Sequence, residues 1–154
     1  LNYFKGVKGH NTVSINGENH LQKGPLFTWL KLPKHLGTLS KEHDDYFEIQ
    51  SHMSLSYPYH HELKRTIRKF KKQLKWTITD EVVGLRKEDK LVQNWNYNTK
   101  FQGDILVQNL SDNLYEIQEK NTSYSVYYGS KLDLKNKSIT TSSNTLTTQI
   151  KITT

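Results

Sequence analysis

Histidine is the residue type in this sequence best suited to bind a metal ion, and all seven histidines lie in the first half of the chain. No two of them have the His-x-x-x-His spacing that puts two ligands on one face of a helix. The adjacent pair His60 and His61 would point to opposite faces of a strand. On base rates of burial, the remaining histidines are expected to be exposed or hydrogen-bonded. They include His20, His35, His43 and His52.

Two neighbouring carboxylates, Asp80 and Glu81, raise the question of acid-base chemistry on a glycosidic bond. That chemistry needs both groups to flank the same bond, whereas adjacent strand residues face opposite sides of a sheet. Asp80 and Glu81 are therefore expected to finish a hairpin. Tyrosines could stack on sugar rings, but aromatic residues on strands are more often core or cross-strand partners. We expect such positions for Tyr57, Tyr59, Tyr124, Tyr127 and Tyr128.

The composition favours strands over helices. Alanine, the strongest helix former, does not occur, and aromatic residues make up 11% of the chain. A chain of 154 residues without a composition shift is expected to form a single domain, residues 1–154. The absence of cysteine excludes disulfides and thiolate metal sites. No apolar run approaches the length needed to span a bilayer, so no membrane span is expected.

The net charge of +7 suits a polyanionic partner, which could be a nucleic acid, an anionic lipid or an acidic polysaccharide. No aromatic-basic signature of an RNA-binding sheet is present, so a nucleic-acid partner is not expected. The densest basic stretch runs from Lys64 to Lys75 and carries charge on both faces of a strand. Such a pattern is typical of an edge strand or a solvated hairpin.

Alternating polar and apolar residues recur along the chain and predict strands with one wet face. Turn residues such as Asn16-Gly17 and Ser111-Asp112-Asn113 fall between these segments. The spacing predicts an all-β fold, an antiparallel β-sandwich. The expected strands are 12–16, 46–50, 65–70, 76–80, 105–107, 115–117, 125–128 and 148–152.

Three segments fit this pattern less simply. Residues 19–43 are expected to form a long connection with one strand around Phe27 to Lys31. Residues 51–63 are expected to be irregular around a proline turn. The Ser- and Thr-rich tail alternates well enough to predict a final strand pair with a turn near Ser142 to Asn144.

Two segments carry a resemblance to a known family: YFKGVKGHNTVSINGENH and HHELKRTIRKFKKQLKWTITDEVVG. In the first, Tyr3-Phe4 precedes His10-Asn11-Thr12-Val13, and a strand ends at the Asn16-Gly17 turn. In this order, the two segments resemble the C-terminal β-sandwich of the heparinase II/III-like polysaccharide lyases. The likeness covers about residues 3–97 and is architectural beyond them. In the second segment the matching positions are His61, Arg65, Ile67, Trp76, Ile78, Asp80, Glu81 and Gly84.

The resemblance implies a two-part enzyme, in which an α/α toroid supplies much of the substrate cleft and a β-sandwich packs against it. Such lyases cleave acidic polysaccharides by β-elimination. A group neutralises the uronate carboxylate, a base removes the C5 proton, and an acid, typically tyrosine, protonates the leaving oxygen. Neither the toroid nor the first strands of the sandwich occur in this sequence. The chain is therefore expected to be a truncated, inactive part of a longer lyase.

A metal site is also implied by the resemblance. Relatives with a metal in the sandwich, usually zinc, use a histidine and an aspartate from upstream strands and the histidine of the His-Asn-Thr segment. His10 matches that third position. Because the other two ligands are not in this sequence, zinc is expected in the full-length protein and not bound tightly by this chain.

The expected partners are an acidic polysaccharide and the toroid of the same protein. A stand-alone carbohydrate-binding module is the alternative, with surface aromatics and lysines that hold sugar without chemistry. The bacterial periplasm or the cell surface is the favoured location under the lyase hypothesis. The sequence does not identify the polysaccharide, because the residues that select it would lie mostly in the toroid.

Overall fold

The structure of the chain is a computed structural model that describes residues 6–25, 28–98, 104–111, 115–124 and 132–153. These residues form one short 3-10 helix, η1 (Val7–Gly9), and otherwise strands and loops. Among them, no helix has the length and apolarity needed to cross a membrane. The strands are β1 (Val13–Ile15), β2 (Gln22–Lys23), β3 (Trp29–Leu30), β4 (Lys34–Glu42), β5 (Tyr46–Leu55), β6 (His61–Phe70), β7 (Lys75–Val83), β8 (Leu91–Asn98), β9 (Asp104–Asn109), β10 (Tyr115–Tyr124), β11 (Leu132–Thr141) and β12 (Thr145–Thr153).

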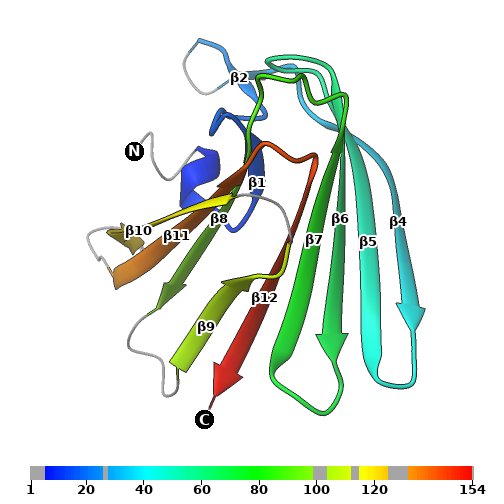
Figure 1. The fold of residues 1–154 in the computed structure, drawn as a ribbon. Coiled ribbons are helices and arrows are strands. Elements are labelled where there is room, and N and C mark those ends of the chain that lie inside the picture. Colours follow the sequence, from blue (N-terminus) through cyan, green and yellow to red (C-terminus); the bar gives the residue numbers. More distant parts are fainter. Residues whose placement is uncertain (1–5, 26–27, 99–103, 112–114, 125–131, 154) are drawn as a thin grey trace.

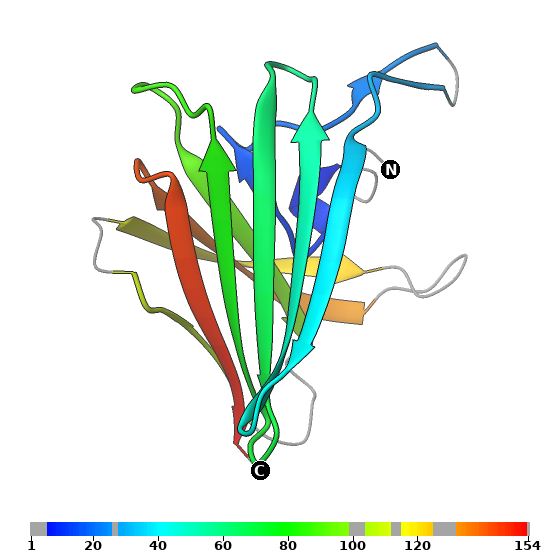
Figure 2. The ribbon, with the colours of Figure 1, turned by 90° about the vertical axis from the view of Figure 1, so that its right-hand side faces the viewer.

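Two antiparallel sheets face each other, and a third element is a two-stranded hairpin. The large sheet has the order β4-β5-β6-β7-β12-β9, and the small sheet has the order β1-β8-β11-β10. Strands β2 and β3 pair only with each other. Figure 1 shows the small sheet beside the large one, and Figure 2 shows its strands crossing behind the long strands of the large sheet. The predicted all-β antiparallel sandwich is confirmed.

The hydrophobic core lies between the sheets and follows the period of two that defines a strand. On β7, Ile78, Asp80 and Val82 are buried while the residues between them are partly exposed. Residues from β1, β8 and β11 of the small sheet pack on the other side of the core. The buried apolar residues of the core are Val13, Ile15, Leu55, Leu63, Ile78, Val82, Leu91, Trp95, Val107, Ile139 and Leu146.

The prediction of an edge strand within Lys64–Lys75 is wrong, although the predicted hairpin is present. Strand β6 pairs with β5 on one side and β7 on the other, so it lies inside the large sheet. It tolerates charge there because its arginines have carboxylate partners on the neighbouring strands. Arg65 pairs with Asp80 on β7, and Arg68 pairs with Glu48 on β5.

Three further expectations need correction. Residues 51–63 are not irregular throughout, because β5 extends to Leu55 and β6 begins at His61. Residues 19–43 contain three strands and not one, because β4 and the β2-β3 hairpin both fall in this segment; Phe27 lies outside the described residues. Every residue of β4 except Gly37 is exposed. Because no side of β4 is buried, its sequence has no alternation of polar and apolar residues that would predict a strand. The tail does form two strands joined at residues 142–144, but β11 belongs to the small sheet and β12 to the large sheet.

The Asn16-Gly17 turn after β1 is confirmed by its backbone. Both residues have positive φ angles, 55° and 70°, which asparagine and glycine tolerate better than other residues. The strand expected at 125–128, with Tyr127 and Tyr128, lies outside the described residues, as does the side chain of Tyr124. Tyr59 does not occupy a core position: its side chain is exposed, and the Arg86 guanidinium lies 3.8 Å from its ring centroid.

Candidate binding site around the His-Asn-Thr segment

The segment His10-Asn11-Thr12 connects η1 to β1 and is held by a short series of backbone contacts. The Asn19 side-chain oxygen accepts a hydrogen bond from the Val7 amide at 2.9 Å, which fixes the start of η1. The His10 amide then donates to the Val7 carbonyl at 3.1 Å, and the Thr12 amide donates to the His10 carbonyl at 3.0 Å. The turn therefore presents His10 at the surface, where its side chain is exposed.

Asn11 attaches this segment to both sheets. Its side-chain oxygen accepts a hydrogen bond from the Asn96 amide on β8 at 2.6 Å. Its backbone carbonyl accepts one from Arg65 Nη1 on β6 at 2.8 Å. The Asn94 amide also donates to the Thr12 carbonyl, at 2.8 Å. The position of His10 consequently depends on β6 as well as on β8.

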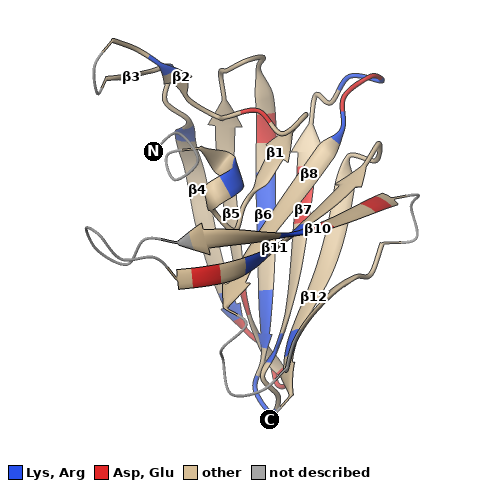
Figure 3. Ribbon diagram, turned by 90° about the vertical axis from the view of Figure 1, so that its left-hand side faces the viewer, with Lys and Arg blue, Asp and Glu red and all other residues tan. Residues whose placement is uncertain are grey.

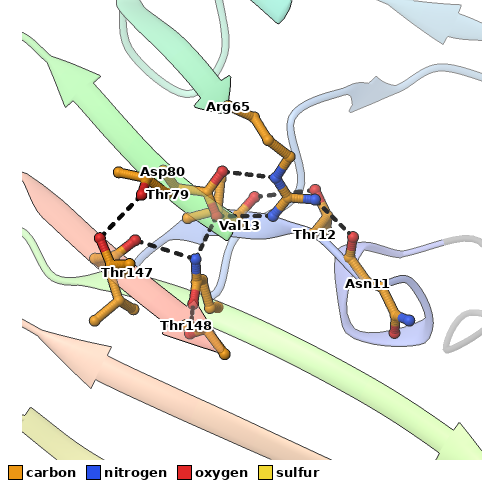
Figure 4. A network of polar contacts seen from close by, with 10 residues as sticks. Asn11, Thr12, Val13, Arg65, Thr79, Asp80, Thr147 and Thr148 are labelled. Carbon is orange, nitrogen blue, oxygen red and sulfur yellow. Dashed lines mark hydrogen bonds and ion pairs between the residues drawn. The ribbon is translucent and has the colours of Figure 1, made fainter. Parts of the chain in front are cut away.

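Arg65 is itself oriented by a buried polar network, drawn in Figure 4. Its Nε and Nη2 donate to the two oxygens of Asp80 at 2.6 and 2.8 Å, and Asp80 is fully buried. Gln93 Nε2 donates to Asp80 at 2.6 Å, and the Thr148 hydroxyl donates to Gln93 Oε1. A buried carboxylate requires this kind of compensation, because a charge without partners is costly in the protein interior. The network joins β6, β7, β8 and β12, and through Arg65 it reaches Asn11.

His10 and His20 line the same hollow, which has a volume of about 370 Å³. Burial lowers the pKa of His20, and a hydrogen bond to the Val13 backbone opposes this effect. The ring is therefore neutral near pH 7. Its Nε2 is buried without a hydrogen-bond partner among the described residues, so His20 departs from the expectation for a satisfied histidine. The hollow also has an apolar wall that includes Trp29, Pro33 and Met53.

The other histidines behave mostly as expected. His35 hydrogen-bonds to Thr38 at 2.9 Å, and His52 to Glu62 at 3.0 Å. His43 stacks on Tyr46 but departs from the expectation as His20 does, because its Nε2 is buried without a hydrogen-bond partner among the described residues. His60 is exposed while His61 is buried, in agreement with their predicted opposite orientations. Burial lowers the pKa of His61, against the opposing effect of the Asp89 carboxylate.

The described residues do not complete a zinc site. Structural and catalytic zinc ions take three or four protein ligands, and no group of three or more His, Asp or Glu side chains in the described part of the chain could hold a metal ion. His10 and His20 supply two imidazoles to one hollow. The role of His10 as a metal ligand stays a prediction, because it depends on ligands from outside this chain.

Asp80 does not finish a hairpin, since β7 continues to Val83. Asp80 and Glu81 do face opposite sides: Asp80 is fully buried, and Glu81 is partly exposed. Sequence reasoning missed the ion pair between Arg65 and Asp80. A signal was available, because Arg65 lies between Leu63 and Ile67 in the alternating pattern, and Asp80 lies between Ile78 and Val82. Opposite charges at inward positions of adjacent strands indicate a buried pair.

Solved structures share this fold. Heparan sulfate lyase HepC from Pedobacter heparinus matches with a TM-score of 0.69 and 11% sequence identity, over 98% of this chain and 25% of that protein. A heparinase III gene product matches with a TM-score of 0.65 and 14% identity, over 99% of this chain and 25% of that protein. The chain thus spans about a quarter of the length of these structures. At these identities the likeness defines the fold class, a β-sandwich of the kind found in heparinase-type lyases.

Sequence comparison defines the family. Residues 1–152 match the family described as heparinase II/III-like, C-terminal. The chain belongs to this family, which confirms the resemblance carried by the His-Asn-Thr segment. Among curated protein sequences, none matches the chain.

Proposed function

We propose that the chain is the sandwich part of a lyase-like protein that cleaves acidic, uronate-containing polysaccharide by β-elimination, and that the chain alone is not catalytic. The observation that carries this proposal is the family match over residues 1–152. The similar solved structures are those of a heparan sulfate lyase and a heparinase III gene product, and those proteins are about four times as long. The net charge of +7 also suits a polyanionic substrate.

The residues around His10 support a division of roles between two domains. β-Elimination requires a group that neutralises the carboxylate, a base for the C5 proton and an acid for the leaving oxygen. The hollow around His10 offers two imidazoles and the Thr12 hydroxyl, but no tyrosine and no cationic Lys or Arg side chain in its described lining. In this proposal, the sandwich positions the sugar chain against a toroid that supplies the remaining proton-transfer groups.

Zinc is part of the proposal only for the full-length protein. His10 would be one ligand, on the exposed turn after η1. When bound, zinc would fix the position of this turn and polarise a neighbouring ligand. The described residues contribute the scaffold of the turn, through Asn11, Asn96 and Arg65.

The direct test is a lyase assay on two proteins: this chain and the full-length protein that contains it. Both are incubated with acidic polysaccharides, and the unsaturated uronate product is followed by its ultraviolet absorbance. We expect product only from the full-length protein. Turnover by this chain alone would contradict the division of roles, and sugar binding without turnover by either protein would favour a carbohydrate-binding module.

A further inference from the structure

A second hollow, with a volume of about 460 Å³, lies next to the hollow that His10 lines. Pockets for small ligands usually have volumes of roughly 300–1,000 Å³. The lining comes from η1, the turn after β1, strand β2 and the loop after β5, which meet at one end of the sandwich (Figure 1). Its residues are Gly6, Lys8, Gly17, Glu18, Asn19, Leu21, Lys23 and Tyr57.

Two lysines, against the one carboxylate of Glu18, give this hollow a net positive charge. Lys8 comes from η1 and Lys23 from β2, and neither forms an ion pair with a described carboxylate. Figure 3 shows basic colouring on η1 and on β2 at the same end of the molecule. In contrast, Lys71 and Lys137 are paired with Glu42 and Glu119. Two unpaired ammonium groups from different elements favour an anionic ligand.

The backbone turn helps to place Lys8. A Cβ atom on Gly17 would lie 3.7 Å from Lys8 Cε, so the lysine stem runs along this glycine. The Gly17 φ angle of 70° also suits glycine at this position. The stem can therefore pack on the turn while the ammonium group stays accessible. Tyr57 adds a hydroxyl to the lining, and Glu18 adds a carboxylate that can accept hydrogen bonds from sugar hydroxyls.

The two hollows are adjacent, because Gly6, Asn19 and Leu21 line both of them. Asn19 also fixes η1, through its hydrogen bond from the Val7 amide. In the hollow around His10, Trp29 provides an aromatic side chain, and His20 provides part of its imidazole ring. An aromatic side chain beside a cationic hollow suits a charged sugar chain.

We propose that the two hollows form one groove for an anionic polysaccharide. Lys8 and Lys23 bind a carboxylate or sulfate group, and Trp29 and His20 contact the neighbouring sugar ring. This inference rests on the function proposed above and names the surface of this chain that holds the substrate. Because the groove combines charge and an aromatic side chain, binding should depend on both the anion and the sugar.

The test compares two double variants with equal loss of charge. K8Q/K23Q changes the groove. K72Q/K151Q changes two exposed lysines outside the lining of both hollows: Lys72 lies in the β6-β7 turn, and Lys151 lies on β12. Affinity is measured by calorimetry at low salt for a heparan sulfate oligosaccharide, an unsulfated uronate oligosaccharide and neutral dextran. We expect K8Q/K23Q to weaken binding of an anionic probe at least tenfold, and K72Q/K151Q less than twofold. Unfolding curves check that both variants remain folded.

Each outcome has a separate meaning. Binding of both anionic probes assigns the lysines to a carboxylate, and binding of the sulfated probe alone assigns them to a sulfate. Equal losses in the two double variants would overturn the groove while leaving the proposed substrate class intact. A wild-type chain that binds dextran as tightly as the anionic probes would overturn the groove and also count against an acidic substrate.

Discussion

Arg65 and Arg68 lie on the same strand and each pairs with a carboxylate, but they face opposite sides of the large sheet. Arg65 points toward the small sheet, where its side chain is 20% exposed and its partner Asp80 is fully buried. Arg68 points to the outer face, where its side chain is 49% exposed and Glu48 is 19% exposed. An arginine–carboxylate pair therefore contributes differently to the structure when it lies between the sheets and when it lies on the outer face.

The inner pair has further partners that the outer pair lacks. Arg65 also donates a hydrogen bond to the Asn11 carbonyl, and Asp80 accepts a hydrogen bond from Gln93 Nε2. Arg68 has the Tyr46 ring 5.5 Å from its guanidinium carbon. The buried pair therefore links the sheets to the His-Asn-Thr segment, whereas the outer pair stabilises only the contact between β5 and β6.

The largest effect is expected for Asp80→Asn. The substitution keeps the size of the side chain but leaves the Arg65 guanidinium without a carboxylate in a buried position. Removing one partner of a buried ion pair typically costs about 3–5 kcal/mol. Urea unfolding of the variant should show a loss in this range. A loss below about 1 kcal/mol would show that the pair contributes no more than a surface pair.

A smaller effect is expected for Gln93→Leu. The change removes the donor to Asp80 and the acceptor for Thr148, both of which are buried. Asp80 keeps both hydrogen bonds from Arg65, so the Thr148 hydroxyl is the group that loses its partner, at a cost of about 1–3 kcal/mol. The matched control is Gln50→Leu on the outer face, where Gln50 donates to Thr66 at 3.2 Å. Urea unfolding should show a larger loss of unfolding free energy for Gln93→Leu than for Gln50→Leu. Equal losses in the two variants would contradict the distinction between the inner and outer faces.

The smallest effect is expected for Glu48→Gln, about 1 kcal/mol or less at neutral pH. The hydrogen bond from Arg68 lowers the pKa of Glu48, so the folded chain favours the ionised carboxylate. This contribution is present above the ordinary glutamate pKa of about 4.3 and is lost as the pH falls through the lowered value.

Unfolding free energies at neutral and acidic pH, for wild type and Glu48→Gln, check this expectation. The difference between the two proteins should shrink on acidification and also at high salt. A difference that grows at acidic pH would have the wrong sign and would contradict the assignment.

Alternation of polar and apolar residues predicted some strands and missed others. Strand β8 was missed although it is largely buried, because polar Gln93 and Asn94 occupy buried positions and break the alternation. The alternation on β7, with Ile78 and Val82 directed inward, predicted its position. Strand β4 was missed because almost all of its residues are exposed, and its pairing with β5 comes from the backbone. The pairing of β11 and β12 was wrong because a turn motif shows where the chain reverses, but not which sheet each strand joins.

The candidate site was also predicted in part. The His-Asn-Thr motif predicted the family, whereas the role of His10 as a metal ligand stays a prediction. The motif could not indicate that Lys8 and Lys23 line one hollow and that His20 joins His10 in an adjacent one, because the hollows form only where η1, β2 and the loops meet. Arg65 and Asp80 matched the family pattern, but their link to Asn11 depends on how the two sheets face each other.

The central claim is that the interior arginine positions the His-Asn-Thr segment. Amide hydrogen exchange tests it in two matched variants, Arg65→Lys and Arg68→Lys, because lysine keeps the charge but loses the planar guanidinium fork. The amides to follow are those of Asn94 and Asn96, which donate to Thr12 and Asn11. After correction for global stability, both amides should exchange faster in Arg65→Lys and at the wild-type rate in Arg68→Lys. Unchanged protection in Arg65→Lys would contradict the claim.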